Sequence, residues 1–452
     1  MGADIPATNS RIARPLNTAE WSFRLLERFV PMNCLVLAEV AGPLDVDVLR
    51  RAMDAVQQRH PLLRTRLVDG RWNRCCFEDF EGVELPLRVV DCALDKWVIE
   101  AERELGTPFS LSRGPLGRCT LIRKNPDRWA VMFTFHHIIG DAQGGGRVLM
   151  DIMQVAGAIL EGKLIELPVR ASTGGMLRRM PSGARGARGF GRYLRFALAD
   201  GWRNRSFGGA RPLAVDERIP TAARQTRILA RRLESPVITA LQARARREST
   251  TLHGILAAAQ LQGVAGEFQL PGEIRLAISS TINLRRRLDP VVDDQELGLY
   301  SSIMDTVHAA GESLSIWDVA RDVRQRMRQC VRVRHPSMLA YDKILKTAIL
   351  RKLVPLTERN VARLDRYFTT RDIAPSIISM PPAVPKMVFG PLEITSACGV
   401  VSQPRSPWAS LASVVYGHLR WNFIHHSPSM GSDRAGRLAD RIILALERAI
   451  EE

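Results

Sequence analysis

The strongest constraint on the fold is an apolar run that ends in two adjacent histidines, within "RWAVMFTFHHIIGDAQGGG" from residue 128 onward. The run 129–135 is too apolar for a strand with one solvated face, so it predicts a strand buried on both faces. From Gly146 onward, apolar residues recur at helical spacing and predict a helix as far as Leu160. The histidines therefore fall in a loop between a buried strand and a helix, where functional side chains are common.

Helical and strand-like patterns alternate along the rest of the chain, which predicts a mixed α/β fold. The 452 residues exceed the usual size of a single hydrophobic core, so two domains are expected. We expect an N-terminal half at 1–165 that carries the histidines and a C-terminal half at 216–452. Between them, 166–215 is rich in Arg and Gly and predicts a crossover linker with one short helix around Arg192–Asp200.

The N-terminal half contains the clearest local signals. The stretch "LDVDVLRRAMDAVQQRHP" predicts a helix that Asp45 or Asp47 can cap and that Pro61 ends. His60 at its end is expected to bond backbone carbonyls. The stretch before this helix, "NCLVLAEVAG", predicts a strand, and "LLRTRLV" and "WNRCCFE" after it predict a strand pair.

The formal charge of +17 favours anionic partners, although solvated arginine-rich faces would give the same total. Within residues 170–212, aromatic residues stand between arginines and Asp200 is the only acidic residue. This composition is compatible with a solvated crossover or with peripheral contact with an anionic membrane. Nucleic-acid binding is disfavoured, because RNA recognition needs more ordered aromatic platforms.

The seven cysteines are scattered and form no CxxC pair, and the N-terminal residues lack the apolar core of a signal peptide. We therefore expect reduced thiols and a cytoplasmic location. No metal-ligand spacing is evident, and no metal or permanently bound cofactor is expected.

The histidine motif contains the elements of a general base. Histidine titrates near neutral pH, so His136 or His137 could accept a proton, and a nearby carboxylate such as Asp141 can shape the loop. Gly145 and its neighbouring glycines let the backbone turn sharply or approach a ligand. The alternative is structural, with one histidine packed and the other in an ordinary hydrogen bond.

Several segments, in this order and spacing, resemble the chloramphenicol-acetyltransferase-like superfamily. This group includes condensation domains of nonribosomal peptide synthetases, polyketide-associated acyltransferases, wax ester synthases and alcohol acyltransferases. "HHIIGDA" is similar to the family's HHxxxDG motif. The other matching segments are "RPLNTAEW", "LRRAMDAVQQRHPLLRTRL", "TPFSLSRGPLGRCTLIR", "TTLHGILAAA" and "STINLRRRL".

This resemblance implies two similar domains in a V, with an active-site tunnel at their junction. It implies that an acyl thioester on coenzyme A, or on the phosphopantetheine of an acidic carrier protein, reacts with an acceptor alcohol or amine. His137 matches the general base and His136 the architectural histidine. Asp141 matches the structural aspartate, for which Arg285 is the expected partner and Arg287 the second choice.

The sequence departs from the family pattern at two places. Ala142 replaces the motif glycine, and its methyl group could narrow the tunnel. The segment "IISMPPAV" lacks the Asn and Gly of the family's SNxG, so that Ser379, water or a backbone N–H is left to stabilise the oxyanion. These departures leave a decayed binding protein as one alternative to an O-acyltransferase. A free-standing condensation enzyme that forms an amide is the other. The second histidine pair, His425 and His426, is expected to be structural.

Overall fold

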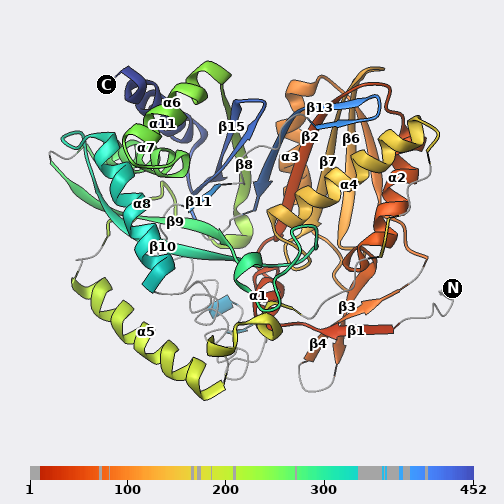
Figure 1. Cartoon of the computed structure of the whole chain (residues 1–452), viewed down its shortest axis with the longest axis horizontal. Helices are drawn as coiled ribbons and strands as arrows, with labels where there is room; N and C mark the ends of the chain where they lie inside the picture. Colours follow the sequence, from red (N-terminus) through yellow and green to blue (C-terminus); the bar gives the residue numbers. More distant parts are fainter. Residues whose placement is uncertain are drawn as a thin grey trace. The chain divides into compact units, whose positions relative to one another are not determined.

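The structure is a computed structural model that describes most of the chain and confirms the mixed α/β class (Figure 1). The described residues are 11–70, 74–80, 82–163, 167–169, 175–184, 186–206, 210–269, 272–333, 359–360, 362–363, 376–379, 387–402 and 406–451.

The first compact unit is built around a six-stranded sheet in the order β12-β13-β2-β7-β6-β5. β7 pairs antiparallel with β2 and β6 and is buried along its whole length after its first residue, as its sequence predicts. The strands are β2 (Asn33–Ala41), β5 (Leu87–Asp91), β6 (Gly117–Asn125), β7 (Arg128–His136), β12 (Met387–Phe389) and β13 (Leu392–Val401).

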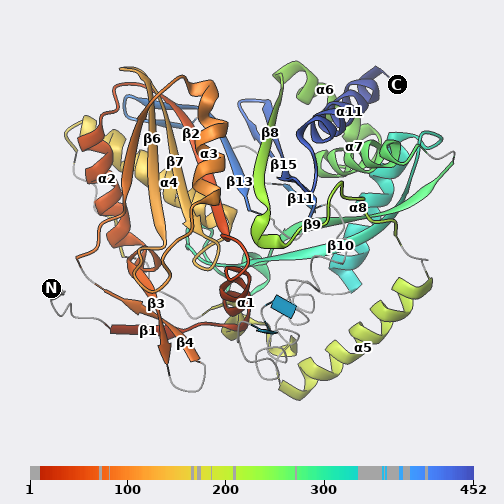
Figure 2. The same ribbon diagram turned by 180° about the vertical axis from the view of Figure 1, so that it is seen from behind.

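Helices cover both faces of this sheet, which explains why β7 has no solvated side. α4 (Ala142–Leu160) packs on β2 and β7 with α2 (Val46–Arg59) beside it, and α3 (Trp97–Gly106) packs on the opposite face (Figures 1 and 2). The predicted N-terminal helix is α2, and Asp45 is its cap, with Oδ1 accepting from the Val48 N–H at 2.7 Å.

A smaller three-stranded sheet in the order β1-β4-β3 completes this unit, together with α1 (Thr18–Leu26). Its strands are β1 (Arg11–Pro15), β3 (Thr65–Gly70) and β4 (Arg74–Asp79). The expected strand pair is present as β3 and β4, but Pro61–Arg64 form a short 3-10 helix instead of the start of the strand. Pro61 at the first helical position favours this turn.

The second compact unit also has a six-stranded sheet, in the order β10-β9-β11-β14-β15-β8. Its strands are β8 (Gln225–Leu233), β9 (Ile274–Asn283), β10 (Ser301–Ala310), β11 (Ser376–Ser379), β14 (Trp408–Val415) and β15 (His418–Ser427). Its helices are α5 (Gly186–Ser206), α6 (Ser235–Arg247), α7 (Leu252–Glu267), α8 (Ile316–Val333) and α11 (Ser432–Glu451).

The core of the second unit lies between its sheet and the helices α6, α7, α8 and α11. α7 is buried almost all round, while α11 buries the apolar stripe that its sequence predicts. The helix expected around Arg192–Asp200 is α5, and it is longer at both ends than expected.

The two units do not follow the chain as two continuous halves. Residues 292–300 and 384–401 belong to the first unit, although the chain on either side of them belongs to the second. The domain boundaries at residues 165 and 216 stay a prediction of the sequence.

Two glycines of α4 offer a matched test of the packing between this helix and strand β12. A Cβ on Gly157 would lie 2.2 Å from the Phe389 carbonyl oxygen of β12, whereas a Cβ on Gly146 would meet nothing within 4 Å. Gly157→Ala should therefore lower the free energy of unfolding by about 1–3 kcal/mol, because backbone must shift. Gly146→Ala should raise it by roughly 0.5–1 kcal/mol through helix propensity. Urea unfolding measures both, and equal effects of the two variants would contradict the packing.

Candidate active site

The buried strand β7 delivers the histidine motif to the edge of the first unit's sheet. His136, its last residue, pairs with Asn33 of β2, and residues 137–141 form the loop that leads into α4. From Trp129 to Asp141 every residue is buried except His137, which is partly exposed. The fold therefore presents one side chain of this segment to solvent.

Three contacts hold His137 in place. Its Nδ1–H donates to the Gly140 carbonyl at 2.8 Å, and its backbone N–H donates to the Met32 carbonyl at 2.8 Å. Its ring lies against Phe23 of α1, with 4.3 Å between the ring centroids. Since the carbonyl can only accept, Nδ1 carries the proton and Nε2 carries the lone pair. No described residue hydrogen-bonds to Nε2, which leaves that nitrogen able to accept a proton.

The surroundings of His137 also favour its neutral form. Burial lowers the pKa of His137 below its ordinary value, and the Gly140 hydrogen bond and the Asp141 charge oppose this only in part. An imidazole with a lowered pKa is unprotonated at neutral pH, which is the state that a general base needs.

His136 is held differently, in a closed network. It is fully buried, its Nδ1 accepts from the Ile138 N–H at 3.0 Å, and its Nε2–H donates to Glu27 Oε2 at 3.0 Å. Glu27, just after α1, also accepts from the Met32 N–H. Both ring nitrogens of His136 are thus engaged, and its role in the fold is to join α1, β2 and β7.

Asp141 caps α4 and ties the loop to the segment before β10. Its Oδ1 accepts from the Gly144 N–H and its Oδ2 from the Tyr300 N–H, both at 3.0 Å. Its own N–H donates to the Gly298 carbonyl at 3.2 Å. The carboxylate is almost fully buried and satisfies backbone donors, so it shapes the loop in which His137 lies.

The glycine cluster allows α4 to approach β7 closely. A Cβ on Gly145 would lie 2.1 Å from the Phe135 ring, so a side chain there would push the helix away from the strand. Ala142 is the first residue of α4 and is partly buried. Gly145 therefore supports the motif through packing, and the effect of Ala142 on substrate size stays a prediction.

A second buried carboxylate, Asp151, lies further along α4. It accepts from His60 Nε2–H at 2.9 Å and forms ion pairs with Arg59 at 3.0 Å and Arg147 at 2.6 Å. Burial acts to raise the pKa of Asp151, but the His60 hydrogen bond and the arginine charges outweigh it and lower that pKa. The expectation that His60 bonds backbone carbonyls is wrong, because the fold brings Asp151 against it.

This cluster reaches the segment that contacts Asp141. The other end of the Arg59 guanidinium donates to Gln295 Oε1 at 2.9 Å, three residues before Gly298. Sequence reasoning missed the roles of Glu27, Asp151 and Tyr300, which act through contacts between distant segments. The only available signal was for Asp151, an acidic residue in the otherwise apolar "VLMDIMQVA".

The other predicted site residues belong to the second unit. Arg285 is fully buried at the start of the short helix Arg285–Arg287, whereas Arg287 is exposed. A buried guanidinium needs anionic or carbonyl partners, so Arg285 suits the expected role better than Arg287. Its pairing with Asp141 stays a prediction. Ser379 is the last residue of β11, and the residues of "IISMPPAV" after it lie outside the described part of the chain.

The second histidine pair lies near the end of β15, as expected of structural residues. His425 Nδ1 is bonded to the Met430 carbonyl at 3.1 Å, and His425 and His426 are both buried.

Cys34, which pairs with Phe135 across β2 and β7, is buried, and burial raises the pKa of its thiol well above the ordinary value. Cys34 is therefore no thiolate nucleophile.

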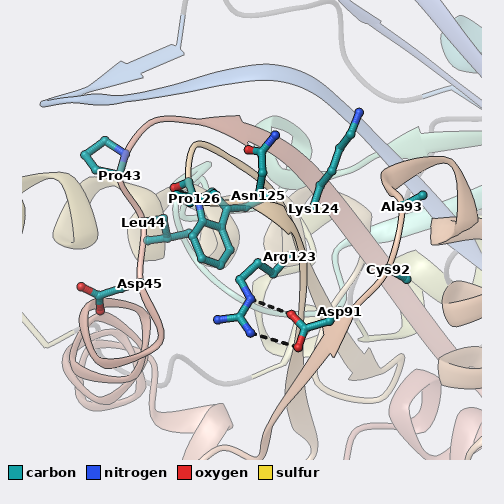
Figure 3. A pocket seen from close by; sticks show the side chains of 11 residues that line it. Pro43, Leu44, Asp45, Asp91, Cys92, Ala93, Arg123, Lys124, Asn125 and Pro126 are labelled. Carbon is teal, nitrogen blue, oxygen red and sulfur yellow. Dashed lines mark hydrogen bonds and ion pairs between the residues drawn. The ribbon is translucent and has the colours of Figure 1, made fainter.

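Figure 3 shows a surface pocket, which has a volume of about 860 Å³. Its lining residue Trp129 is near the start of β7, at the opposite end of the strand from the motif. The Asp91–Arg123 ion pair also lines the pocket. His136 follows Trp129 by seven positions along the strand, which is about 23 Å. The pocket is therefore separate from the histidine site.

No group of three or more potential metal ligands occurs among the described residues. The helices in the same part of the chain include none long and apolar enough to cross a membrane.

Two family models match this chain in succession. The model of the condensation domain matches residues 25–171, and that of the phthiocerol/phthiodiolone dimycocerosyl transferase C-terminus matches residues 220–371.

Similar sequences come from very large synthetases. A component of the linear gramicidin synthase of Brevibacillus parabrevis is 32% identical over 166 residues, which are 34% of this chain and 3% of that protein. Chondramide synthase cmdD of Chondromyces crocatus is 29% identical over 240 residues, 49% of this chain and 6% of that protein. The chain thus spans a few per cent of the length of these relatives.

Solved structures share the fold over nearly the whole chain. The first condensation domain of the calcium-dependent antibiotic synthetase, in complex with a substrate analogue, has a TM-score of 0.73 and 18% identity, with 97% of each chain covered. Polyketide synthase associated protein 5 from Mycobacterium tuberculosis has a TM-score of 0.65 and 18% identity, with 98% of each covered. The starter condensation domain of rhizomide synthetase, in complex with C8-CoA and Leu-SNAC, has a TM-score of 0.70 and 15% identity, with 97% of this chain and 95% of that one covered. Residues 25–171 and 220–371 thus match these two family models in chain order, and the chain shares the fold of solved condensation domains, which confirms the predicted resemblance to the chloramphenicol-acetyltransferase-like superfamily.

Proposed function

We propose that this chain is an acyltransferase that moves an acyl group from a thioester to an acceptor hydroxyl in one direct step. The observation that carries the proposal is the state of His137. His137 is the one partly exposed residue of the buried segment 129–141. Its Nδ1–H donates to the Gly140 carbonyl, and its Nε2 has no hydrogen-bond partner among the described residues.

In the proposed reaction, His137 Nε2 accepts the proton of the acceptor hydroxyl as its oxygen attacks the thioester carbonyl. The C–O bond forms, the C–S bond breaks, and the imidazolium returns its proton to the departing thiolate. No enzyme-bound acyl intermediate is required, which agrees with the protonated state of Cys34. Asp141 acts as a positioning residue, because both of its oxygens accept backbone N–H groups.

The proposed donor is an acyl-coenzyme A or an acyl group on a carrier protein. One structural relative was solved with C8-CoA, and the sequence relatives include a nonribosomal peptide synthetase of Curvularia clavata. The charge of +17 attracts a phosphate-bearing donor or an acidic carrier protein.

Amide formation is the second candidate, because residues 25–171 match the condensation-domain model and the sequence relatives include a nonribosomal peptide synthetase. The nucleophile would then be an amine, and His137 would accept its proton. A panel of pooled alcohols and pooled amines separates the two products. A catalytically decayed binding protein would release no thiol with either.

The first prediction concerns His137 itself. With an acyl-coenzyme A panel and pooled acceptors, His137→Ala should lower acceptor-dependent thiol release by about 10²–10⁴-fold, because it removes the base. His418→Ala, which changes a partly exposed histidine of β15 in the second unit, should leave the rate unchanged. The same assay is repeated with acyl groups on an acyl carrier protein as donors. The proposal fails if neither donor class releases thiol, or if both variants behave as wild type.

The pH profile of the wild type tests the protonation state. His137 must be neutral to act, and its pKa is lowered by burial, so kcat/KM should rise with pH and level off below the ordinary histidine value of about 6.5. The initial rate at low substrate concentration gives this profile. An acidic limb centred above that value would assign the essential group elsewhere.

Asp141→Asn tests the positioning role. One amide oxygen cannot replace both carboxylate oxygens, so either the Gly144 or the Tyr300 N–H loses its acceptor. The free energy of unfolding should fall by about 1–3 kcal/mol. Loss of the negative charge should also move the acidic limb of kcat/KM to lower pH, because the Asp141 charge raises the pKa of His137. Asp127→Asn, on the exposed turn between β6 and β7, is the control. An unchanged limb together with unchanged stability would contradict the assignment.

A further inference from the structure

Helix α5, which the proposed reaction does not use, presents three distinct faces. It runs over Gly186–Ser206, so its 21 residues are about 31 Å long. The side chains described along it extend as far as Leu198. Gly189 and Tyr193 are buried and define the inner face, and the remaining described positions are exposed.

The inner face holds α5 against the turn that precedes it. A Cβ on Gly189 would lie 2.4 Å from the backbone of Ala184, so the helix and the turn are in close contact there. Arg192 adds a hydrogen bond from Nη1 to the Gly183 carbonyl at 3.1 Å. The direction of the other two faces is therefore fixed relative to this turn.

The second face is an apolar stripe of Phe190, Leu194 and Leu198. These side chains are 45%, 45% and 74% exposed, and they follow one another at four-residue spacing. Four residues advance the helical angle by about 40°, so the three side chains lie within an arc of about 80°. The other large apolar side chains exposed in the described part of the chain are scattered over other elements. A row of this kind needs an explanation, whereas single exposed side chains do not.

The third face is basic and borders the stripe. Arg188, Arg192 and Arg195 are exposed and share one side of the helix at four- and three-residue spacing. Over the whole helix the sequence contains five arginines and one acidic residue, Asp200. No described acidic side chain forms an ion pair with Arg188 or Arg195, so their charge is available to an anionic partner.

We propose that α5 lies on the surface of an anionic lipid bilayer, with the apolar stripe in the headgroup and acyl boundary and the arginines on lipid phosphates. An interfacial helix needs this combination of an apolar face and a flanking basic face. The long arginine side chains can reach the phosphates while their stems remain among apolar groups.

The size of the stripe favours lipid over a protein partner. A stable protein interface buries at least about 1,200 Å² in total and needs a complementary shape. Three side chains along one helix supply only a fraction of that area. A fluid bilayer imposes no shape requirement, and the arginines add electrostatic attraction of about 1 kcal/mol each, which corresponds to about five-fold in affinity. The proposal is independent of the chemistry at His137.

Flotation of the full chain with phosphatidylcholine vesicles, with and without phosphatidylglycerol, tests the proposal. The wild type should float with the anionic vesicles and lose affinity as salt is raised. The double variant Leu194→Ser/Leu198→Ser should bind roughly ten-fold more weakly or worse. Arg188→Gln/Arg195→Gln should lose about five-fold per arginine on anionic vesicles.

Matched controls change exposed residues of the same types elsewhere. Ile99→Ser/Leu444→Ser and Arg51→Gln/Arg103→Gln should bind as the wild type does. The proposal is overturned if the wild type fails to float, if the α5 variants bind as their controls do, or if phosphatidylglycerol makes no difference.

A fluorescent probe distinguishes insertion from adsorption. With Leu198→Trp, the blue shift of the emission on anionic vesicles and its quenching by brominated acyl chains should exceed those of the wild type, whose eight tryptophans set the baseline. Leu444→Trp should show no increase over the wild type in either quantity. Sedimentation without lipid provides the last test: a dimer of the wild type that Leu194→Ser/Leu198→Ser converts to monomer would show that the stripe binds a second copy, and would overturn the lipid assignment.

Discussion

Burial of β7 on both faces is the constraint on which the rest of the first unit depends. The strand is covered by α4 on one side and α3 on the other, and its burial continues into the loop as far as Asp141. Polar groups in such a segment must find partners within the protein, since water is excluded. The side chains of His136 and Asp141 and several backbone groups of residues 136–141 accordingly bond to one another or to neighbouring elements. No described residue hydrogen-bonds to His137 Nε2, so this nitrogen is available to a substrate.

Three carboxylates, one just after α1, one at the N-cap of α4 and one within α4, satisfy polar groups in and around this region. Glu27 accepts from His136 and the Met32 N–H, Asp141 accepts from two backbone N–H groups, and Asp151 accepts from His60 and pairs with arginines. Removal of one partner from such a buried group leaves the other unsatisfied, which costs more than the bond itself contributes. Each carboxylate therefore fixes the local backbone conformation and contributes little net free energy to folding.

Sequence patterns predicted those features of the fold that depend on residues close together in the chain. The burial of β7, the cap of α2 at Asp45, the loop position of His137 and the stripe of α11 all follow from neighbouring residues, whereas His136, also expected in the loop, is the last residue of β7. Contacts between distant segments were not predictable, because no local pattern brings Tyr300 to Asp141, Asp151 to His60, or β13 to β2. The extent of α5 was missed for another reason. Its glycines and arginines suggested a linker, but Gly189 serves close packing against Ala184 and does not end the helix.

The same physical setting decides how strong a base His137 can be in the proposed reaction. A carboxylate in direct contact with Nδ1 would raise the pKa of the imidazole, whereas the neutral Gly140 carbonyl fixes the tautomer with a smaller effect. Burial then lowers the pKa, and Asp141 restores it only in part. A base with a lowered pKa is weaker, but a larger fraction of it is unprotonated at neutral pH. In a chain with a charge of +17, this arrangement keeps the base neutral while the surface still attracts an anionic donor.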